Sequence, residues 1–273
     1  MERYFQVSFH QTLPEQKEIL IALLTGIGFT GFEESGKALA ACIPLSDFDE
    51  SSFQEIVTDQ FYYTSKIIEP KNWNEEWERS FSPVIVDDYC IIRASFHPPV
   101  SAVAHEIIIT PKMSFGTGHH ATTYLMIRLM KNLPFTNRTA LDFGTGTGVL
   151  AILAEKLGAS SITAIDNDNW SVENAKENIA ANRCHRIRVL ESNAPPSGAA
   201  YDIILANINK NVILAEMTAM EQHLKGDGIL IVSGLLMEDE NEIADRAATS
   251  NLTIVHTEYK DSWIALILKR KVI

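Results

Sequence analysis

The chain has 273 residues, 46% of them hydrophobic and 21% charged, and its 23 Lys and Arg against 35 Asp and Glu give a formal net charge of -12. This size and composition predict a soluble globular protein of one or two domains. No run of about 18 apolar residues predicts a membrane span, and the N-terminus lacks the layout of a signal peptide, so a cytoplasmic location is expected.

The charge balance disfavours non-specific binding of nucleic acid and favours a basic partner, although acidity of this degree also serves solubility alone. Cys42, Cys90 and Cys184 are odd in number and far apart, without the spacing of a metal or redox motif. They are expected to be reduced, partly buried thiols.

Residues 1–69 are predicted to form a small domain. Alternating apolar residues indicate strands, and Ile19, Leu20, Leu23 and Leu24 recur at helical spacing. The predicted strands are 4–9, 29–34, 38–44 and 61–68, and the predicted helices are 14–27 and 48–57. The order βαββαβ is typical of the split, ferredoxin-like α+β unit. No catalytic motif lies in this segment, so recognition of a partner or substrate is its expected role.

Residues 70–82 are predicted to form a linker helix that ends at a proline. Trp73 and Trp77 are four residues apart and share one helix face. Packing against a domain is the ordinary interpretation of this pair, and contact with a substrate is the alternative. Residues 83–273 form the larger domain, which opens with predicted strands at 84–86, 90–94 and 106–110.

A glycine-containing loop at 111–123 precedes the next predicted helix. The adjacent His119 and His120 suggest a metal site, but neighbouring residues rarely converge on one ion and no third ligand stands at metal spacing. A loop that closes over a cofactor, with Thr122 or Thr123 donating a hydroxyl at the helix start, is the simpler interpretation.

Residues 139–158 are predicted to form a strand, a glycine loop and a helix. Gly144, Gly146 and Gly148 provide a backbone that can bend sharply and approach a ligand. The dinucleotide fingerprint requires a small residue where this chain has Val149, so the pattern differs from that fingerprint. Taken alone, three glycines are equally compatible with an ordinary tight turn.

The next strand, 161–166, ends in Asp166, about 20 residues beyond the loop, where a carboxylate can bind the two hydroxyls of a ribose. Such a carboxylate also disfavours a phosphorylated ribose. Alternatively, Asp166 caps the following helix, whose start is marked by Asp168, Asn169 and Ser171.

The remaining chain continues the alternation of helices and strands. Helices are predicted at 170–182, 212–224 and 238–250, and strands at 186–191, 201–209, 228–233, 252–258 and 263–269. Asn207 stands at the end of an apolar strand. Because ligands of open α/β sheets bind at the carboxyl ends of strands, Asn207, Asp166 and the Gly144 loop are expected to share one crevice.

Several motifs together resemble one family, the bacterial methyltransferases of large-subunit ribosomal protein eleven, over nearly the whole chain. The motifs are Asn72-Trp-Asn-Glu-Glu-Trp77, Phe115-Gly-Thr-Gly-His-His-Ala-Thr-Thr123, Leu141-Asp-Phe-Gly-Thr-Gly-Thr-Gly-Val-Leu-Ala-Ile152, Ile165-Asp-Asn-Asp168 and Ala206-Asn-Ile208. The resemblance implies a Rossmann-like class I methyltransferase sheet preceded by the small ferredoxin-like domain.

The resemblance also implies that the cofactor is S-adenosylmethionine, bound by Thr123, Gly144, Asp166 and Asn207. Gly146, in the same loop as Gly144, is also expected to bind it. The expected activity is transfer of methyl groups to lysine side chains, and also to the N-terminal amine, of the ribosomal protein. The small domain is expected to recognise this basic protein. No direct contact with nucleic acid or membrane and no metal are expected, and a monomer is the default expectation.

A lysine with a pKa of about 10.4 is cationic at neutral pH and must lose a proton before it attacks a methyl group. Desolvation in a closed crevice favours the neutral amine. No acid or base flanks Asn207 in the sequence, so no general base is assigned, and orientation is expected to provide most of the rate. The Asn207 side-chain oxygen is the candidate catalytic group that would orient the amine.

Four alternatives remain at this point. A methyltransferase acting on a nucleobase or a glutamine amide usually has Asn-Pro-Pro-aromatic, whereas Asn207 is followed by Ile-Asn-Lys. A nicotinamide dehydrogenase requires a small residue at Val149. A methyltransferase for another protein or a small amine shares the same motifs, and a non-catalytic adaptor of the ribosome would bind its partner without transferring a methyl group.

Overall fold

The computed structural model describes residues 3–57, 61–68, 81–100, 103–110 and 116–271. The chain divides into two compact units, Met1–Arg79 and Ser80–Ile273. Most of the predicted linker helix at 70–82, including Trp73 and Trp77, lies outside the described residues, as do residues 111–115 of the loop before His119.

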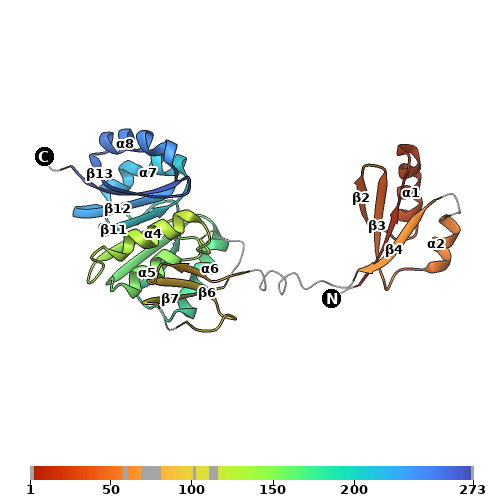
Figure 1. Cartoon of the computed structure of the whole chain (residues 1–273), viewed down its shortest axis with the longest axis horizontal. Coiled ribbons are helices and arrows are strands. Elements are labelled where there is room, and N and C mark those ends of the chain that lie inside the picture. The colour runs from red at the N-terminus through yellow and green to blue at the C-terminus, as the bar shows by residue number, and fades with distance from the viewer. Residues whose placement is uncertain (1–2, 58–60, 69–80, 101–102, 111–115, 272–273) are drawn as a thin grey trace. The chain divides into compact units, whose positions relative to one another are not determined.

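The N-terminal unit is a four-stranded antiparallel sheet with two helices (Figure 1). Its elements are β1 (Tyr4–Phe9), α1 (Pro14–Gly26), β2 (Gly31–Ser35), β3 (Ala38–Pro44), α2 (Glu50–Ile56) and β4 (Tyr63–Ile68). The strands lie in the order β2-β3-β1-β4. Leu39, Ala41 and Ile43, every second residue of β3, are buried, because successive side chains of a strand point to opposite faces. They pack with Leu20 of α1 and Phe53 of α2 in one core.

The C-terminal unit is built on a seven-stranded sheet in the order β10-β9-β8-β11-β12-β14-β13. These strands are β8 (Thr139–Phe143), β9 (Ser161–Asp166), β10 (Ile187–Glu191), β11 (Tyr201–Asn207), β12 (Leu224–Leu236), β13 (Leu252–Lys260) and β14 (Trp263–Arg270). The first five in this order are parallel, and β14 pairs antiparallel with both β12 and β13. The last two predicted strands, 252–258 and 263–269, thus form an antiparallel hairpin at the end of the sheet.

Helices cover both faces of this sheet (Figure 1). The helices are α4 (Ala121–Lys131), α5 (Val149–Lys156) and α6 (Asn169–Ala181) on one face, and α7 (Lys210–Gln222) and α8 (Glu240–Thr249) on the other, with the short 3-10 helix η1 (Met237–Asp239) before α8. Central strands are consequently apolar along most of their length, as in β11, where only the last residue, Asn207, is not fully buried.

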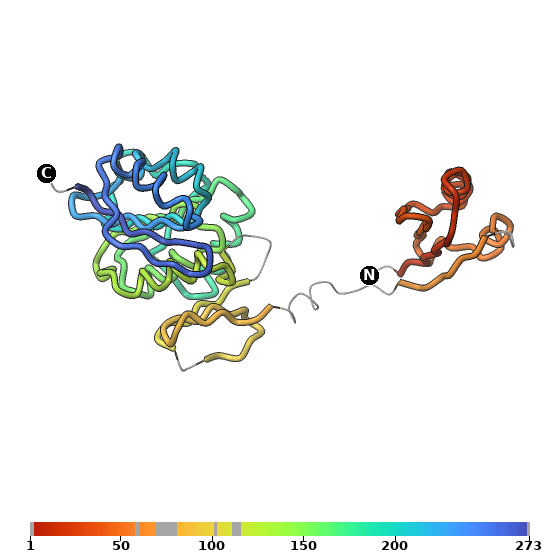
Figure 2. Tube along the Cα trace, turned by 45° about the horizontal axis from the view of Figure 1, so that its top comes forward, coloured from red at the N-terminus to blue at the C-terminus, as the bar shows by residue number. Residues whose placement is uncertain are grey.

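A separate three-stranded sheet in the order β5-β6-β7 lies beside the main sheet and is drawn in orange to yellow in Figure 2. It consists of β5 (Val84–Val86), β6 (Cys90–Ala94) and β7 (His105–Ile109). Asn178 of α6 and Asn182, the C-cap residue that follows this helix, satisfy the backbone of β7 and its end. The Asn182 amide bonds both the N–H (2.9 Å) and the C=O (2.6 Å) of Ile108, and the Asn178 oxygen accepts from the Thr110 N–H at 2.7 Å. Side chains thus take the place of a neighbouring strand.

Several elements differ from the sequence prediction. Helix α7 begins at Lys210 rather than residue 212, because the Asn209 side chain caps it by accepting from the Val212 N–H at 3.1 Å. Strand β12 extends beyond 228–233 at both ends and contains a bulge between Ser233 and Leu235. Pairing of residues 229–236 with β14 sustains the C-terminal extension, and Leu224 pairs with Tyr201 of β11 at the other end; periodicity within β12 cannot reveal either pairing.

The three cysteines are free thiols: Cys42 and Cys184 are half-buried, whereas Cys90 is completely buried rather than partly buried as expected. No described helix combines the length and apolar character needed to cross a membrane.

Candidate functional site

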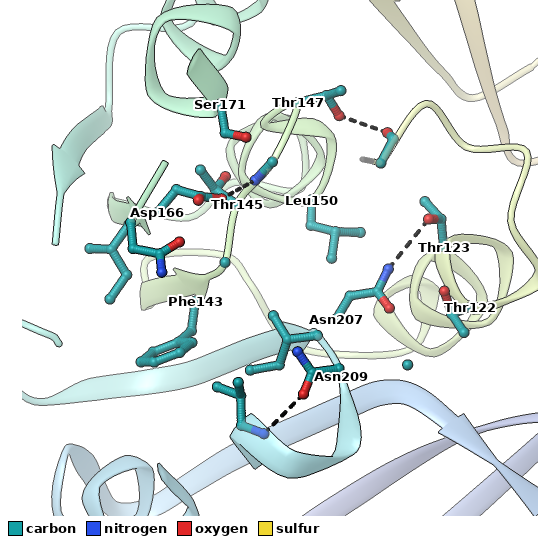
Figure 3. Close-up of a pocket in the computed structure, with 18 of the residues that line it drawn as sticks. Thr122, Thr123, Phe143, Thr145, Thr147, Leu150, Asp166, Ser171, Asn207 and Asn209 are labelled. Atoms are coloured by element: carbon teal, nitrogen blue, oxygen red, sulfur yellow. Dashed lines mark hydrogen bonds between the residues drawn. The ribbon is translucent and has the colours of Figure 1, made fainter. Parts of the chain in front are cut away.

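A cleft of about 830 Å³ opens where β8, β9 and β11 end (Figure 3). All five residues proposed from the sequence line it, namely Thr123, Gly144, Gly146, Asp166 and Asn207. They come from a helix, a loop and two strands that are far apart in the sequence, and parallel strand ends bring them to one edge of the sheet. The lining also includes Thr122, Phe143, Thr145, Thr147, Leu150, Ile165, Ser171, Ser192, Asn193, Ile208, Asn209, Glu216 and Trp263.

The glycine loop adopts a backbone that other residues rarely adopt. Gly144, Gly146 and Gly148 have φ values of 72°, 53° and 80°. A side chain at Gly144 would also collide with Ile208, which follows β11. The loop therefore turns tightly between β8 and α5 and leads into the N-terminus of α5, whose free N–H groups favour anionic groups.

Asp166 lies beside this loop at the end of β9. Its Oδ2 accepts from the Gly146 N–H at 2.9 Å, and its Oδ1 accepts from the Asp168 N–H at 3.1 Å. The helix cap is Asp168 instead, whose carboxylate accepts from the N–H groups of Trp170 (3.3 Å) and Ser171 (3.1 Å). The alternative in which Asp166 caps α6 is therefore wrong, and its carboxylate lines the cleft.

Asp142 on β8 stabilises the glycine loop through hydrogen bonds, and its side chain is buried, with 1% exposed. Its Oδ2 accepts from the Thr145 hydroxyl at 2.6 Å and from the Ala151 N–H at 3.1 Å, whereas Oδ1 has no partner among the described residues. Burial raises the pKa of Asp142 to about 6, against the lowering effect of these two hydrogen bonds. A single carboxylate thus links β8, the loop and α5.

Asn207 lies beside the first turn of α4 in the wall of the cleft (Figure 3). Its Nδ2 donates to the Thr123 hydroxyl oxygen at 3.3 Å, and its Oδ1 is buried without a partner in the described structure. A buried acceptor without a donor is costly in a folded protein, by roughly 1 to 3 kcal/mol. Its position in the cleft suits a ligand that brings an N–H or O–H group.

The two adjacent histidines have different surroundings. The ring of His119 packs edge-on against Phe81 at 4.8 Å, and that of His120 packs edge-on against Trp263 at 4.4 Å. His120 also caps α4, because its Nδ1 accepts from the Thr122 N–H at 3.3 Å. The acceptor that caps this helix is therefore histidine, and the Thr122 hydroxyl, one of the two that the sequence suggested as donors, lies 2.8 Å from the same Nδ1. No group of three metal-binding side chains occurs in the described part of the chain.

Thr147 connects the glycine loop to the loop before α4. Its hydroxyl donates to the Gly116 carbonyl at 2.6 Å, and its own carbonyl accepts from Asn178 Nδ2 at 2.8 Å (Figure 3 shows the first bond). Gly116 has a φ of 100°, and a Cβ there would lie 2.9 Å from the Thr147 hydroxyl. The sequence did not identify Thr147 as a functional residue, because its position between Gly146 and Gly148 was the only signal.

Further lining residues were also missed. Ser192 and Asn193 follow directly after β10, so the rule that ligands bind at the carboxyl ends of strands would have found them. Trp263 begins β14 near the end of the chain, and nothing in its local sequence indicates that it reaches the cleft.

Residues 7–271 match the family model of ribosomal protein L11 methyltransferases. Proteins named ribosomal protein L11 methyltransferase are 40% identical in Porphyromonas gingivalis, covering 93% of this chain and 91% of that protein, and 36% identical in Phocaeicola vulgatus, covering 97% and 98%. A third, from Chlorobaculum tepidum, is 39% identical over 93% of this chain and 92% of that protein.

Solved structures agree on the fold. A ribosomal protein L11 methylase from Lactobacillus delbrueckii has a TM-score of 0.66 and 29% identity, covering 70% of this chain and all of that chain. A 16S rRNA methyltransferase from T. thermophilus, solved with AdoMet and guanosine, shares the fold at a TM-score of 0.50 and 19% identity, covering 58% of this chain and 45% of that chain. With its class I methyltransferase fold and a family match over almost its whole length, this chain belongs to the ribosomal protein L11 methyltransferase family.

Proposed function

We propose that this methyltransferase transfers methyl groups from S-adenosylmethionine to amino groups of ribosomal protein L11, on lysine side chains and at the N-terminal amine. The family match supports the substrate, since its relatives carry that name. The observation that carries the chemistry is the unpaired, buried Asn207 oxygen beside the glycine loop.

The cleft fits S-adenosylmethionine in size and in its polar groups. Its volume of about 830 Å³ falls in the range of small-molecule sites. Asp166 would bind the ribose hydroxyls, and Gly144 and Gly146 would let the cofactor approach the backbone at the N-terminus of α5. Thr123 and Asn207 would border the methyl group from the opposite side. When bound, this cofactor supplies an electrophilic methyl group on a sulfonium.

The amine must arrive neutral and correctly aimed. A lysine ammonium loses its proton to solvent on entering the cleft, because desolvation disfavours the charged form. Its nitrogen lone pair then forms the N–C bond as the S–C bond breaks. The Asn207 oxygen accepts an amine N–H, and the 3.3 Å hydrogen bond to Thr123 sets the orientation of the amide. We assign no general base, and orientation provides most of the rate.

Recognition of the protein substrate is assigned to residues 1–69, residues 70–82 are assigned to a connecting helix, and residues 83–273 to catalysis. The N-terminal unit has a core of its own that shares no residue with the two cores of the larger unit. It can therefore hold a partner without being part of the cleft.

Incubation of the protein with radiolabelled S-adenosylmethionine and purified ribosomal protein L11 tests the proposal. Label should enter L11, and a parallel reaction with Asn207→Ala should incorporate much less. L11 that binds but takes up no label would indicate an adaptor. Label that enters other components of a ribosomal extract, but not L11, would indicate a different substrate.

A further inference from the structure

Helix α1 of the N-terminal unit is apolar on all sides in its second half. The six consecutive residues from Ile19 to Leu24 are Ile-Leu-Ile-Ala-Leu-Leu. Leu20 and Leu24 are completely buried under the helix, whereas Ile19 and Leu23 are 55% and 45% exposed. A helix that is apolar all round is normally covered all round, so this one has an uncovered side.

The uncovered side also carries negative charge. Glu15, Ile19 and Leu23 are four residues apart and form one row along the helix, with Glu18 and Ala22 in the adjacent row. All five are exposed, and neither glutamate has a hydrogen bond or ion pair with any described residue. We refer to Glu15, Glu18, Ile19, Ala22 and Leu23 as the outer α1 face.

The surrounding unit is strongly acidic. Residues 1–69 contain 4 Lys and Arg against 11 Asp and Glu, a formal charge of -7, while residues 70–273 contain 19 against 24, a charge of -5. One of the four cations, Lys17, is buried and paired with Glu34 at 3.0 Å, so it contributes little positive field at the surface. More than half of the net negative charge thus lies in about a quarter of the chain.

We infer that the outer α1 face is the docking surface for the basic protein substrate, an inference that rests on the proposed function. A ribosomal protein that contacts RNA phosphates presents Lys and Arg side chains, which fit Glu15 and Glu18. Its apolar residues would cover Ile19 and Leu23, the desolvated centre of the contact. The cations would form the polar rim.

Two simpler explanations, stabilisation of the helix dipole and incidental exposure of apolar residues, explain only part of the outer α1 face. Glutamates in the first turn of a helix interact favourably with its dipole, and isolated exposed apolar residues are common. Neither effect places two large apolar side chains in register on a helix that is apolar all round. The catalytic unit and a second copy of this chain both bring net negative charge toward Glu15 and Glu18, so a basic partner fits better.

Two double variants of the full chain test the two parts of the surface separately. Ile19→Ala with Leu23→Ala removes the apolar centre, and Glu15→Lys with Glu18→Lys reverses the rim charge. With purified L11 as substrate, each should raise the KM for L11 roughly 10-fold or more. The kcat and the Kd for S-adenosylmethionine should stay unchanged, because the cleft belongs to the other unit. Raising the ionic strength should shrink the difference between the charge variant and the parent.

Matched controls exist on the same unit. Ile67 on β4 is 50% exposed, so Ile67→Ala is an apolar truncation comparable with that at Ile19. Glu33 on β2 is exposed and pairs with Ala40, on the sheet face away from the core, so Glu33→Lys reverses a charge elsewhere. Both controls should leave the KM within about twofold of the parent. Thermal melting of every variant excludes unfolding as the cause.

An unchanged KM in both double variants, with an active parent, would overturn the inference. So would a raised KM that comes with an altered sedimentation coefficient or altered cofactor affinity, because the face would then cover a second copy or the catalytic unit. If the parent transfers no methyl to L11, the proposed function fails, and calorimetric binding of L11 to the same variants still decides the docking surface. Equal L11 affinity of parent and variants, or no L11 affinity at all, would then refute it.

Discussion

Asp166 accepts backbone N–H groups on both of its oxygens, so its carboxylate is held in one orientation at the rim of the cleft. If it also binds the ribose hydroxyls, Asp166→Ala should weaken S-adenosylmethionine binding. Loss of a hydrogen bond to a charged group, about 1.5 to 3 kcal/mol, corresponds to a roughly 10- to 150-fold higher Kd. Isothermal titration calorimetry measures this directly.

A neighbouring carboxylate provides the control for this measurement. Asp168→Ala removes the cap of α6 and should lower stability by about 0.5 to 2 kcal/mol, with a much smaller change in the Kd. Equal cofactor affinity in the parent and Asp166→Ala would disprove the ribose assignment.

Asn207 has two possible roles that kinetics can separate. If it only borders the cofactor, Asn207→Ala should weaken S-adenosylmethionine binding and leave the saturated rate intact. Because Asn207 lines the cleft and its buried oxygen has no partner among the described residues, we expect the saturated rate to fall on the order of 100-fold, the effect of misplacing an amine by about 1 Å. Single-turnover rates at saturating cofactor measure it.

An aspartate at the same position sharpens the distinction. Asn207→Asp keeps an oxygen acceptor, but its charge favours the unreactive ammonium form of the substrate amine. The rate of this variant should therefore recover as pH rises. A pH profile that matches that of the parent would contradict an amine-orienting role.

At the scale of elements, Asp142, which joins β8, the glycine loop and α5, makes the stability of the protein depend on pH. Burial raises the pKa of Asp142 to about 6, so the folded protein binds more protons than the unfolded chain between about pH 4 and pH 6. The contribution of this residue to stability therefore falls as pH rises through that window and levels off above it, by about 3 kcal/mol in total.

Asp142→Asn should remove this slope, since its amide oxygen can still accept from Thr145 and Ala151. Urea unfolding of the parent and variant between pH 4 and pH 7 measures the difference.

Asp202 provides a control of opposite sign. Burial alone would raise the pKa of Asp202, but hydrogen bonds from Lys225, Thr139 and Arg138 outweigh it and hold the pKa below its usual range. Its stabilising contribution is lost as pH falls, so Asp202→Asn should instead reduce the loss of unfolding free energy at acid pH.

Thr147 joins the glycine loop to the loop before α4 through its hydrogen bond to Gly116. Thr147→Val removes the hydrogen bond to Gly116 at nearly constant volume, and a net loss of about 0.5 to 1.5 kcal/mol should lower kcat/KM for S-adenosylmethionine roughly 2- to 12-fold. Thr147→Ser keeps the hydroxyl and should restore the parental value. A Val variant with parental kinetics would show that the tether has no effect on the cleft.

At the scale of the whole molecule, the two units have separate cores and separate assigned tasks. A chain that begins at Ser82 loses Phe81 from one core of the larger unit but retains the rest of both cores and the entire cleft. It should bind S-adenosylmethionine with little loss, because no cleft residue is removed. Methylation of intact L11 should fall on the order of 100-fold or more, since the tethered docking surface that raises the local substrate concentration is gone. Full activity of this shortened chain would assign another task to the N-terminal unit.

The sequence by itself determined the fold class and the order of its elements. Strands such as β1, β3, β6 and β9 have the bounds that the sequence predicted, because an alternating pattern or an apolar run is local and turn residues delimit it. The carboxyl-end rule also predicted that Gly144, Asp166 and Asn207 would share one crevice, and the three do line one cleft.

Only the tertiary structure decided which side chains meet. Thr123 and Asn207 are 84 residues apart, and Thr147 and Gly116 are 31 apart, so no window of sequence contains either pair. The cap of α4 at His120 was also decided by the structure, because histidine is not among the residue types that usually cap a helix. The exposure of Ile19 was equally invisible, because helical spacing identifies an apolar side chain but not whether another element covers it.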